Sequence, residues 1–136
     1  MDKALNYLSL GRKAGVIELG EEPVGASARA LKAKLVVVAQ DAGDHTWRRA
    51  KSFVAGTDQV SVRLPYTKDE MGQATGRTSL AIAAFTDAAM AVAFLKALPQ
   101  PPADAVEMLQ AKADKQKKLK KEAQAHKKNV RFGKKK

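Results

Sequence analysis

Two turns that contain glycine carry the side chains best suited to hold a ligand. Gly20-Glu21-Glu22 follows a short apolar run and precedes a segment with helical periodicity. The N-terminus of a helix offers backbone N–H groups, and Gly20 lets a ligand approach the chain closely. Two carboxylates would repel a phosphate, but they can accept hydrogen bonds from base amino groups, such as those of guanine or cytosine. The same residues also fit a plain strand-to-helix turn with acidic side chains at the positive end of the helix dipole.

The second turn is Gly76-Arg77-Thr78, which closes a glycine-bounded segment that starts at Gly72 and leads into an apolar run. An exposed Arg77 in front of a buried strand is suited to hold a nucleic-acid backbone or a base. Gly76 equally fits the C-terminal cap of a helix, with Arg77 solvated. This segment alone leaves both interpretations open.

Further basic residues flank these turns. Arg12 and Lys13 lie at the end of the first expected helix, and Lys32 and Lys34 precede a strongly apolar run. We expect all four to flank the two turns with positive charge, although Arg12 and Lys13 equally fit a solvated face. The bases of a later helix, Arg49 among them, are interpreted as a solvated helix face.

The sequence offers little for catalysis or metal binding. It contains no Cys and only two His, which removes thiolate ligands and most imidazole chemistry. It has no paired carboxylates near a His, no nucleophile elbow and no glycine-lysine phosphate loop. We therefore predict a protein that is not an enzyme and needs neither a metal nor another cofactor.

Charge is concentrated in the C-terminal part of the chain. Residues 99–136 hold 12 Lys and Arg against 4 Asp and Glu, a balance of 12 − 4 = +8 out of a total of +11. From Lys112 onward only Leu119, Val130 and Phe132 are apolar residues larger than Ala. Such a tail cannot bury itself, so we expect it to be disordered or a frayed helix that contacts the phosphates of a polyanion. Residues 1–98 are the predicted folded domain, and residues 99–136 the Pro-led, Lys-rich tail.

Hydrophobic periodicity predicts helices alternating with strands. Helices are expected over 2–10, from 21 onward, over 44–54, over 69–75 and after Asp87, and strands over 16–19, 35–39, 60–64 and 80–85. This alternation favours an α/β protein, a three-layer α/β/α sandwich with a four-stranded mixed sheet.

Local signals set the expected helix boundaries. Gly11 is expected to end the first helix, and Asp44, Thr67 and Asp87 are expected N-caps.

Apolar spacing also indicates what is buried. Val24, Ala28 and Leu31 recur at i, i+4 and i+7, which predicts that they share a buried face. A further helix over 104–126 would have only Val106 and Leu109 to hold it against the core, which we expect to be too few.

Five segments together resemble the kink-turn-binding ribosomal protein family, the L-seven-Ae and L-thirty-e relatives, and most nearly its bacterial YlxQ-type branch. The segments are Leu8–Gly15, Gly20–Glu22, Ala33–Ala42, Met71–Arg77 and Ala81–Asp87. The resemblance covers residues 4–98 and implies the same α/β/α sandwich. It also implies binding to kink-turn or similar internal-loop RNA, in which the opened loop exposes base edges. In the family, RNA meets the start of the second helix and the loop before the last strand. Here those positions are Gly20-Glu21-Glu22 and Gly76-Arg77-Thr78.

The chain departs from the pattern of the strong kink-turn binders at three positions. Those proteins carry Asn-Glu where this chain has Glu22-Pro23, and a Lys where it has Ala26. Glu22 can still accept hydrogen bonds from guanine, whereas Pro23 and Ala26 cannot replace the Glu and Lys of those proteins. The tail adds affinity without sequence information, because phosphate contacts position a protein and do not specify a sequence.

The sequence thus predicts a non-enzymatic, cytoplasmic protein that binds structured RNA of a ribosomal or kink-turn-like kind. Ribosomes or ribosome-assembly factors are expected partners, and binding to a membrane is not expected. The N-terminal residues lack a basic region followed by a long apolar run, so no signal peptide is expected. The alternative is a protein–protein adaptor in ribosome assembly or transcription that contacts RNA only incidentally.

Overall fold

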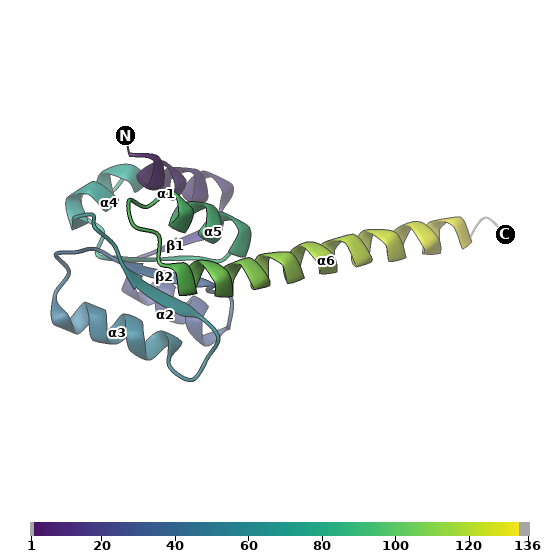
Figure 1. The fold of residues 1–136 in the computed structure, drawn as a ribbon, viewed down its shortest axis with the longest axis horizontal. Helices are drawn as coiled ribbons and strands as arrows, with labels where there is room; N and C mark the ends of the chain where they lie inside the picture. The colour runs from purple at the N-terminus through teal and green to yellow at the C-terminus, as the bar shows by residue number, and fades with distance from the viewer. Residues whose placement is uncertain (1, 134–136) are drawn as a thin grey trace.

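The computed structural model of the protein describes the backbone of residues 2–133 and the side chains of residues 2–123 (Figure 1). Six helices and four strands follow one another along this part of the chain. They are α1 (Lys3–Ala14), β1 (Ile17–Leu19), α2 (Glu21–Arg29), β2 (Leu35–Val38), α3 (Asp44–Val54), β3 (Val60–Arg63), α4 (Lys68–Thr75), β4 (Ile82–Phe85), α5 (Ala88–Lys96) and α6 (Ala103–Gly133).

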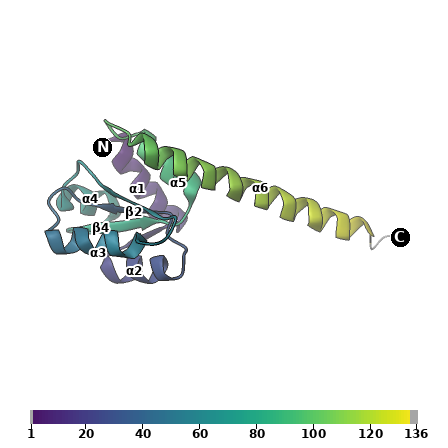
Figure 2. The same cartoon turned by 60° about the horizontal axis from the view of Figure 1, so that its bottom comes forward.

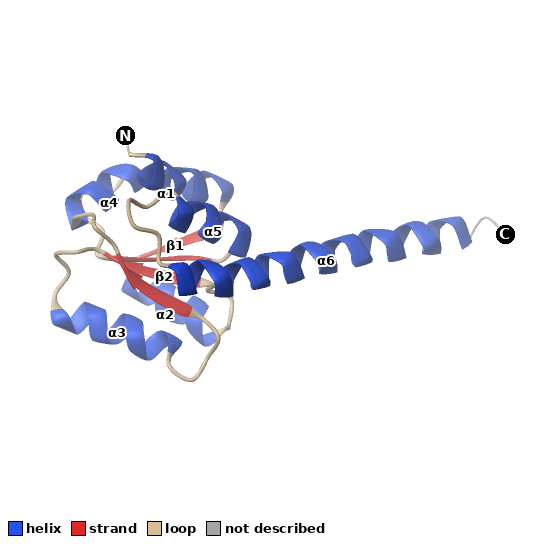
Figure 3. Ribbon diagram, viewed as in Figure 1, coloured by secondary structure: helices blue, strands red, loops and turns tan. Residues whose placement is uncertain are grey.

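The strands form one mixed sheet in the order β1-β4-β2-β3. β4 runs antiparallel to both β1 and β2, and β2 runs parallel to β3. Every residue of β2 and β4 is buried, as expected for central strands covered on both faces. Helices α1, α4 and α5 cover one face and α2 and α3 the other (Figure 3). The predicted α/β/α sandwich with a four-stranded mixed sheet is therefore confirmed.

Two predicted helix boundaries were wrong. α1 continues through Gly11 and ends at Gly15, which has a φ of 72° in the left-handed region that favours glycine. Gly11 is a packing position: a Cβ there would lie 3.2 Å from Cε1 of Phe85. At the start of α3, Gly43 is the N-cap and Asp44 lies in the first turn, where its charge still suits the helix dipole.

The other two predicted N-caps are confirmed. Thr67 and Glu70 form a capping box at the start of α4, and the Asp87 carboxylate accepts a hydrogen bond from the N–H of Met90. The buried stripe on α2 ends earlier than predicted. Leu31 lies beyond the last helical residue, has a φ of 59° and is 63 % exposed, because the chain turns there toward β2.

The described backbone of the basic tail is helical, one of the two states predicted for it. The first turns of α6 pack against α5 and bury Ala105 and Leu109, so the expectation that this helix lacks enough apolar contact was wrong. Lys112 forms an ion pair with Asp58, and the N–H of Ala88 donates to Oε1 of Gln116 at 3.2 Å. Beyond these contacts α6 runs outward from the body (Figures 1 and 2).

No helix in the described part of the chain is both long enough and apolar enough to cross a membrane.

Candidate nucleic-acid interface

The first predicted turn lies at the start of α2. Gly20 is the N-cap of this helix, with φ 97° and ψ 161°, a backbone conformation that is essentially restricted to glycine. Its N–H donates to the carbonyl oxygen of Ile82 at 3.0 Å, which fixes the turn against the start of β4. Gly20 has no side chain to cap the helix, and Pro23 has no N–H. The backbone donors at this turn are therefore those of Glu21 and Glu22.

The second predicted turn begins where α4 ends. Gly76 has a φ of 75°. Its N–H lies 3.5 Å from the carbonyl oxygen of Gln73, and the N–H of Arg77 donates to the carbonyl oxygen of Gly72 at 2.8 Å. These two bonds make a Schellman motif, which turns the chain back along α4. A Cβ on Gly72 would lie 2.8 Å from the carbonyl oxygen of Arg77 and 2.8 Å from Cα and N of Ser79. Glycine at position 72 thus allows the loop to lie directly against the helix.

The structure places the two turns side by side. A Cβ on Gly20 would lie only 3.6 Å from Nη1 of Arg77, so the guanidinium of Arg77 lies over the start of α2. Arg77 and Glu22 are both exposed. We call this the Gly20–Arg77 surface, which comprises Gly20, Glu21, Glu22, Gly76, Arg77 and Thr78. It combines a cation, a carboxylate and backbone donors in one place.

Arg12 lies next to this surface. Its Nη1 donates to the carbonyl oxygen of Thr75 at 2.6 Å, and its guanidinium contacts Gly76. A cation at this position stabilises the negative end of the α4 dipole. Since a guanidinium has five N–H donors, Arg12 keeps others for a ligand. Lys13, in the same last turn of α1, is exposed.

Arg49 of α3 also joins this surface, which the sequence did not indicate. Its Nε lies 2.7 Å from Oε1 of Glu21, and its guanidinium lies 5.3 Å from the ring centroid of Phe53. The interpretation of Arg49 as part of a purely solvated face was therefore incomplete. The pair holds the Glu21 carboxylate toward α3, which leaves Glu22 as the exposed carboxylate of the turn. No local pattern predicts this contact, because it arises only when α2 packs on α3.

Lys34 is not brought together with the two turns. The N–H of Lys34 donates to the carbonyl oxygen of Phe85 at 2.7 Å, and Lys34 accepts from Val60. Phe85 is the last residue of β4, whereas Gly20 is bonded to Ile82, the first. Lys34 thus lies at the opposite end of the sheet, whereas Lys32 lines a hollow with Glu18 and Pro23.

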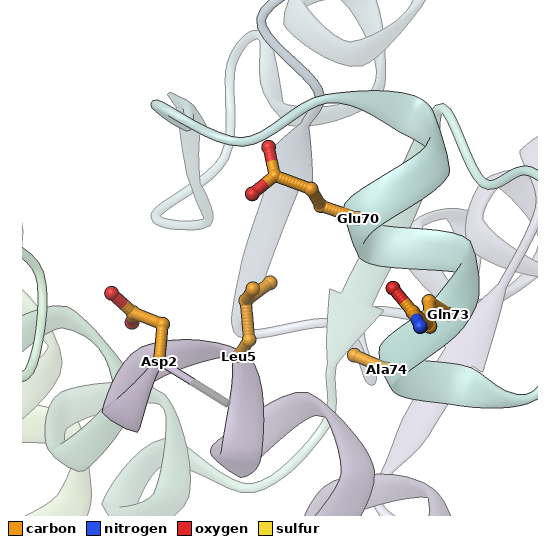
Figure 4. A pocket seen from close by; sticks show the side chains of 5 residues that line it. All are labelled: Asp2, Leu5, Glu70, Gln73 and Ala74. Atoms are coloured by element: carbon orange, nitrogen blue, oxygen red, sulfur yellow. The ribbon is translucent and has the colours of Figure 1, made fainter.

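A groove lies between α1 and α4 (Figure 4). It is lined by Asp2, Leu5, Glu70, Gln73 and Ala74. Both of its carboxylates serve the helix starts: Asp2 accepts from the N–H of Ala4, and Glu70 from that of Thr67. Two negative charges make this groove unsuited to a polyanion.

The Asp2 carboxylate has a second role, which ties α1 to the loop before α4. The hydroxyl of Tyr66 donates to Oδ1 of Asp2 at 2.8 Å. This hydrogen bond lowers the pKa of Asp2. The pKa of the Tyr66 hydroxyl is raised, mainly because the hydroxyl is buried and secondly because it donates this bond. Both residues are therefore engaged in structure.

The fold is shared with proteins of known structure. A protein of unknown function from Bacillus halodurans superposes with a TM-score of 0.67 at 21% identity, covering 74% of this chain and 100% of its own. The 15.5kD RNA binding protein of Giardia lamblia superposes with a TM-score of 0.59 at 19% identity, covering 79% of this chain and 84% of its own. No protein-family model and no curated protein matches the sequence. At these identities the likeness is one of fold.

Proposed function

We propose that the chain is a non-enzymatic RNA-binding protein that holds structured RNA against the Gly20–Arg77 surface. The observation that carries the proposal is the position of the Arg77 guanidinium over the Gly20 turn, which joins two segments distant in sequence into one exposed site. The fold shared with the Giardia lamblia RNA binding protein supports it. We further propose membership of the kink-turn-binding ribosomal protein family, in its YlxQ-type branch, with ribosomal or kink-turn-like RNA and ribosome-assembly factors as cytoplasmic partners.

The chemistry of the site favours an opened RNA loop over a regular duplex. Glu22 accepts hydrogen bonds from the Watson–Crick edge of guanine, which is free in an internal loop and is occupied by base pairing in an A-form duplex. Arg77 donates to a phosphate or to a guanine edge, and Arg12 and Lys13 contact the phosphates beside it. Because Pro23 removes one backbone donor from the first turn of α2, recognition depends on these side chains.

Replacing Arg77 by glutamine should weaken binding of the full chain to a labelled hairpin with an internal loop of sheared G·A pairs. Loss of a charge-assisted hydrogen bond costs about 1.5–3 kcal/mol, so the Kd should rise about 10- to 150-fold. Glu22→Gln should reduce the preference for this hairpin over a plain duplex. Fluorescence anisotropy measures both effects.

Arg48→Gln is the matched control, because Arg48 is exposed on α3 and loses the same charge outside the site. It should leave the Kd nearly unchanged. Equal binding by the wild-type chain and the Arg77 variant would contradict the proposal. Retention of a protein partner by chains that have lost RNA binding would instead favour the adaptor function.

The affinity of the full chain for RNA should fall steeply as salt rises. Each phosphate contact contributes about −0.9 to the slope of log K against log salt on a duplex and about −0.7 on a single strand. A chain ending at Ala111 keeps the buried Ala105 and Leu109 of α6 but loses all 12 Lys and Arg residues of the tail, so its slope should be markedly shallower. Titrations at several salt concentrations test this, and a flat dependence for the full chain would refute a phosphate-binding tail.

A further inference from the structure

α6 leaves the body far from the Gly20–Arg77 surface. The N–H of Gly20 donates to Ile82, the first residue of β4. Gln116 of α6 instead accepts from Ala88, which lies just beyond the last residue of β4. Lys112 contacts Asp58, which precedes β3, and β3 and β1 are the two opposite edges of the sheet. The helix therefore departs from the other end of the sheet, as Figures 1 and 2 show.

The direction of α6 is fixed by its docked turns. Leu109 is fully buried against the body, and Lys112 and Gln116 follow at helical spacing with their own contacts. Since α6 has 31 residues, its axis is about 46 Å long at 1.5 Å per residue. Most of this length lies beyond the docked turns, so the helix carries its charge away from the Gly20–Arg77 surface.

The outward part of α6 presents lysines without an equal number of acids. Lys115, Lys117, Lys118, Lys120 and Lys121 are all exposed. Asp114 and Glu122 are the acids between residues 112 and 123, and Asp114 accepts a hydrogen bond from Gln110. We call these five lysines the α6 surface.

The composition of this surface indicates its ligand. Residues 103–123 contain no aromatic side chain, so they cannot stack on unpaired bases as proteins that bind single strands do. Lysine ammonium groups on a helix bind phosphates without reading sequence. The densest regular array of phosphates in RNA is the backbone of a duplex.

We propose that the α6 surface binds the phosphate backbone of an RNA duplex while the Gly20–Arg77 surface holds an internal loop. One molecule then joins two RNA segments, or two distant parts of one folded RNA. The bridging step rests on the proposed function, but duplex binding by α6 does not.

A bridging assay with two RNAs tests this. The internal-loop hairpin is fixed to beads, and a labelled blunt RNA duplex without internal loops is added with the full chain. The wild-type chain should retain the duplex on the beads. Replacing Lys117, Lys118 and Lys121 by glutamine should abolish duplex retention, while the protein itself stays on the hairpin. Direct titration with the duplex should show a salt slope reduced by about 1 for each lysine that contacts a phosphate.

The control variant replaces Lys3, Lys68 and Lys96 by glutamine, which removes the same charge from the starts of α1 and α4 and the end of α5. It should bridge as well as the wild-type chain. Competition between hairpin and duplex for one site would overturn the proposal, as would tighter binding of a single strand than of a duplex by the α6 surface. If the hairpin is not bound at all, the proposed function fails, and the direct duplex titration still decides the role of α6.

Discussion

Replacing Leu109 by alanine should lower the free energy of unfolding by about 2–5 kcal/mol, the range for a large apolar side chain removed from a packed core. Leu109 is fully buried between α6 and the body. The remaining ties cannot compensate: the Asp58 side chain is 83% exposed, and exposed ion pairs contribute little. The first turns of α6 should therefore detach, and their amides should lose protection against hydrogen exchange. Urea unfolding and hydrogen exchange measure the two effects.

Met108→Ala is the control for this prediction, because Met108 is the neighbouring residue and is 46% exposed. It should change stability only slightly. If Leu109→Ala behaved like Met108→Ala in both measurements, α6 would not depend on this contact. Detachment of α6 should also weaken bridging of the two RNAs, since the helix would then lose its fixed direction.

Replacing Gly72 by alanine should destabilise the chain and weaken RNA binding together. The added Cβ would lie 2.8 Å from three backbone atoms of Arg77 and Ser79, none of which can rotate away. Overpacking of this kind costs about 1–3 kcal/mol, of which the better helix propensity of alanine recovers at most about 1 kcal/mol. The loop must shift, and the Arg77 guanidinium moves from its place over Gly20. We expect Gly72→Ala to raise the Kd for the hairpin as much as Arg77→Gln does.

Gly43→Ala provides the comparison, because a Cβ on Gly43 meets nothing within 4 Å and its φ of −66° suits any residue. This variant should retain full RNA affinity. Thermal unfolding and anisotropy of both variants separate the effects. A Gly72→Ala chain with wild-type stability and affinity would show that the loop position does not matter.

The layers of the fold could be predicted because each depends on local sequence. The fully apolar runs of β2 and β4 mark central strands, and Thr67 and Asp87 begin helices through their own side chains. Gly11 misled because glycine serves two purposes: it ends helices, and it also permits close packing, as it does here against Phe85. Sequence alone does not distinguish these roles.

The candidate site could be predicted only in part. Each glycine turn was visible, but the contact of Arg77 with Gly20 and the pair of Glu21 with Arg49 depend on how helices pack. The sequence of α5 indicates that another element covers it, because every residue of this helix except Lys96 is apolar. A helix of that kind needs cover around its whole circumference. α1 and the sheet supply part of it, and α6 supplies the rest.

The order in which the chain is synthesised gives this cover a further consequence. The chain emerges from the ribosome with its N-terminus first, so α5 emerges before Leu109. During that interval the outer side of α5 is an exposed apolar surface, at which chaperones bind or chains associate with one another. This apolar surface of α5 is covered only when the first turns of α6 dock.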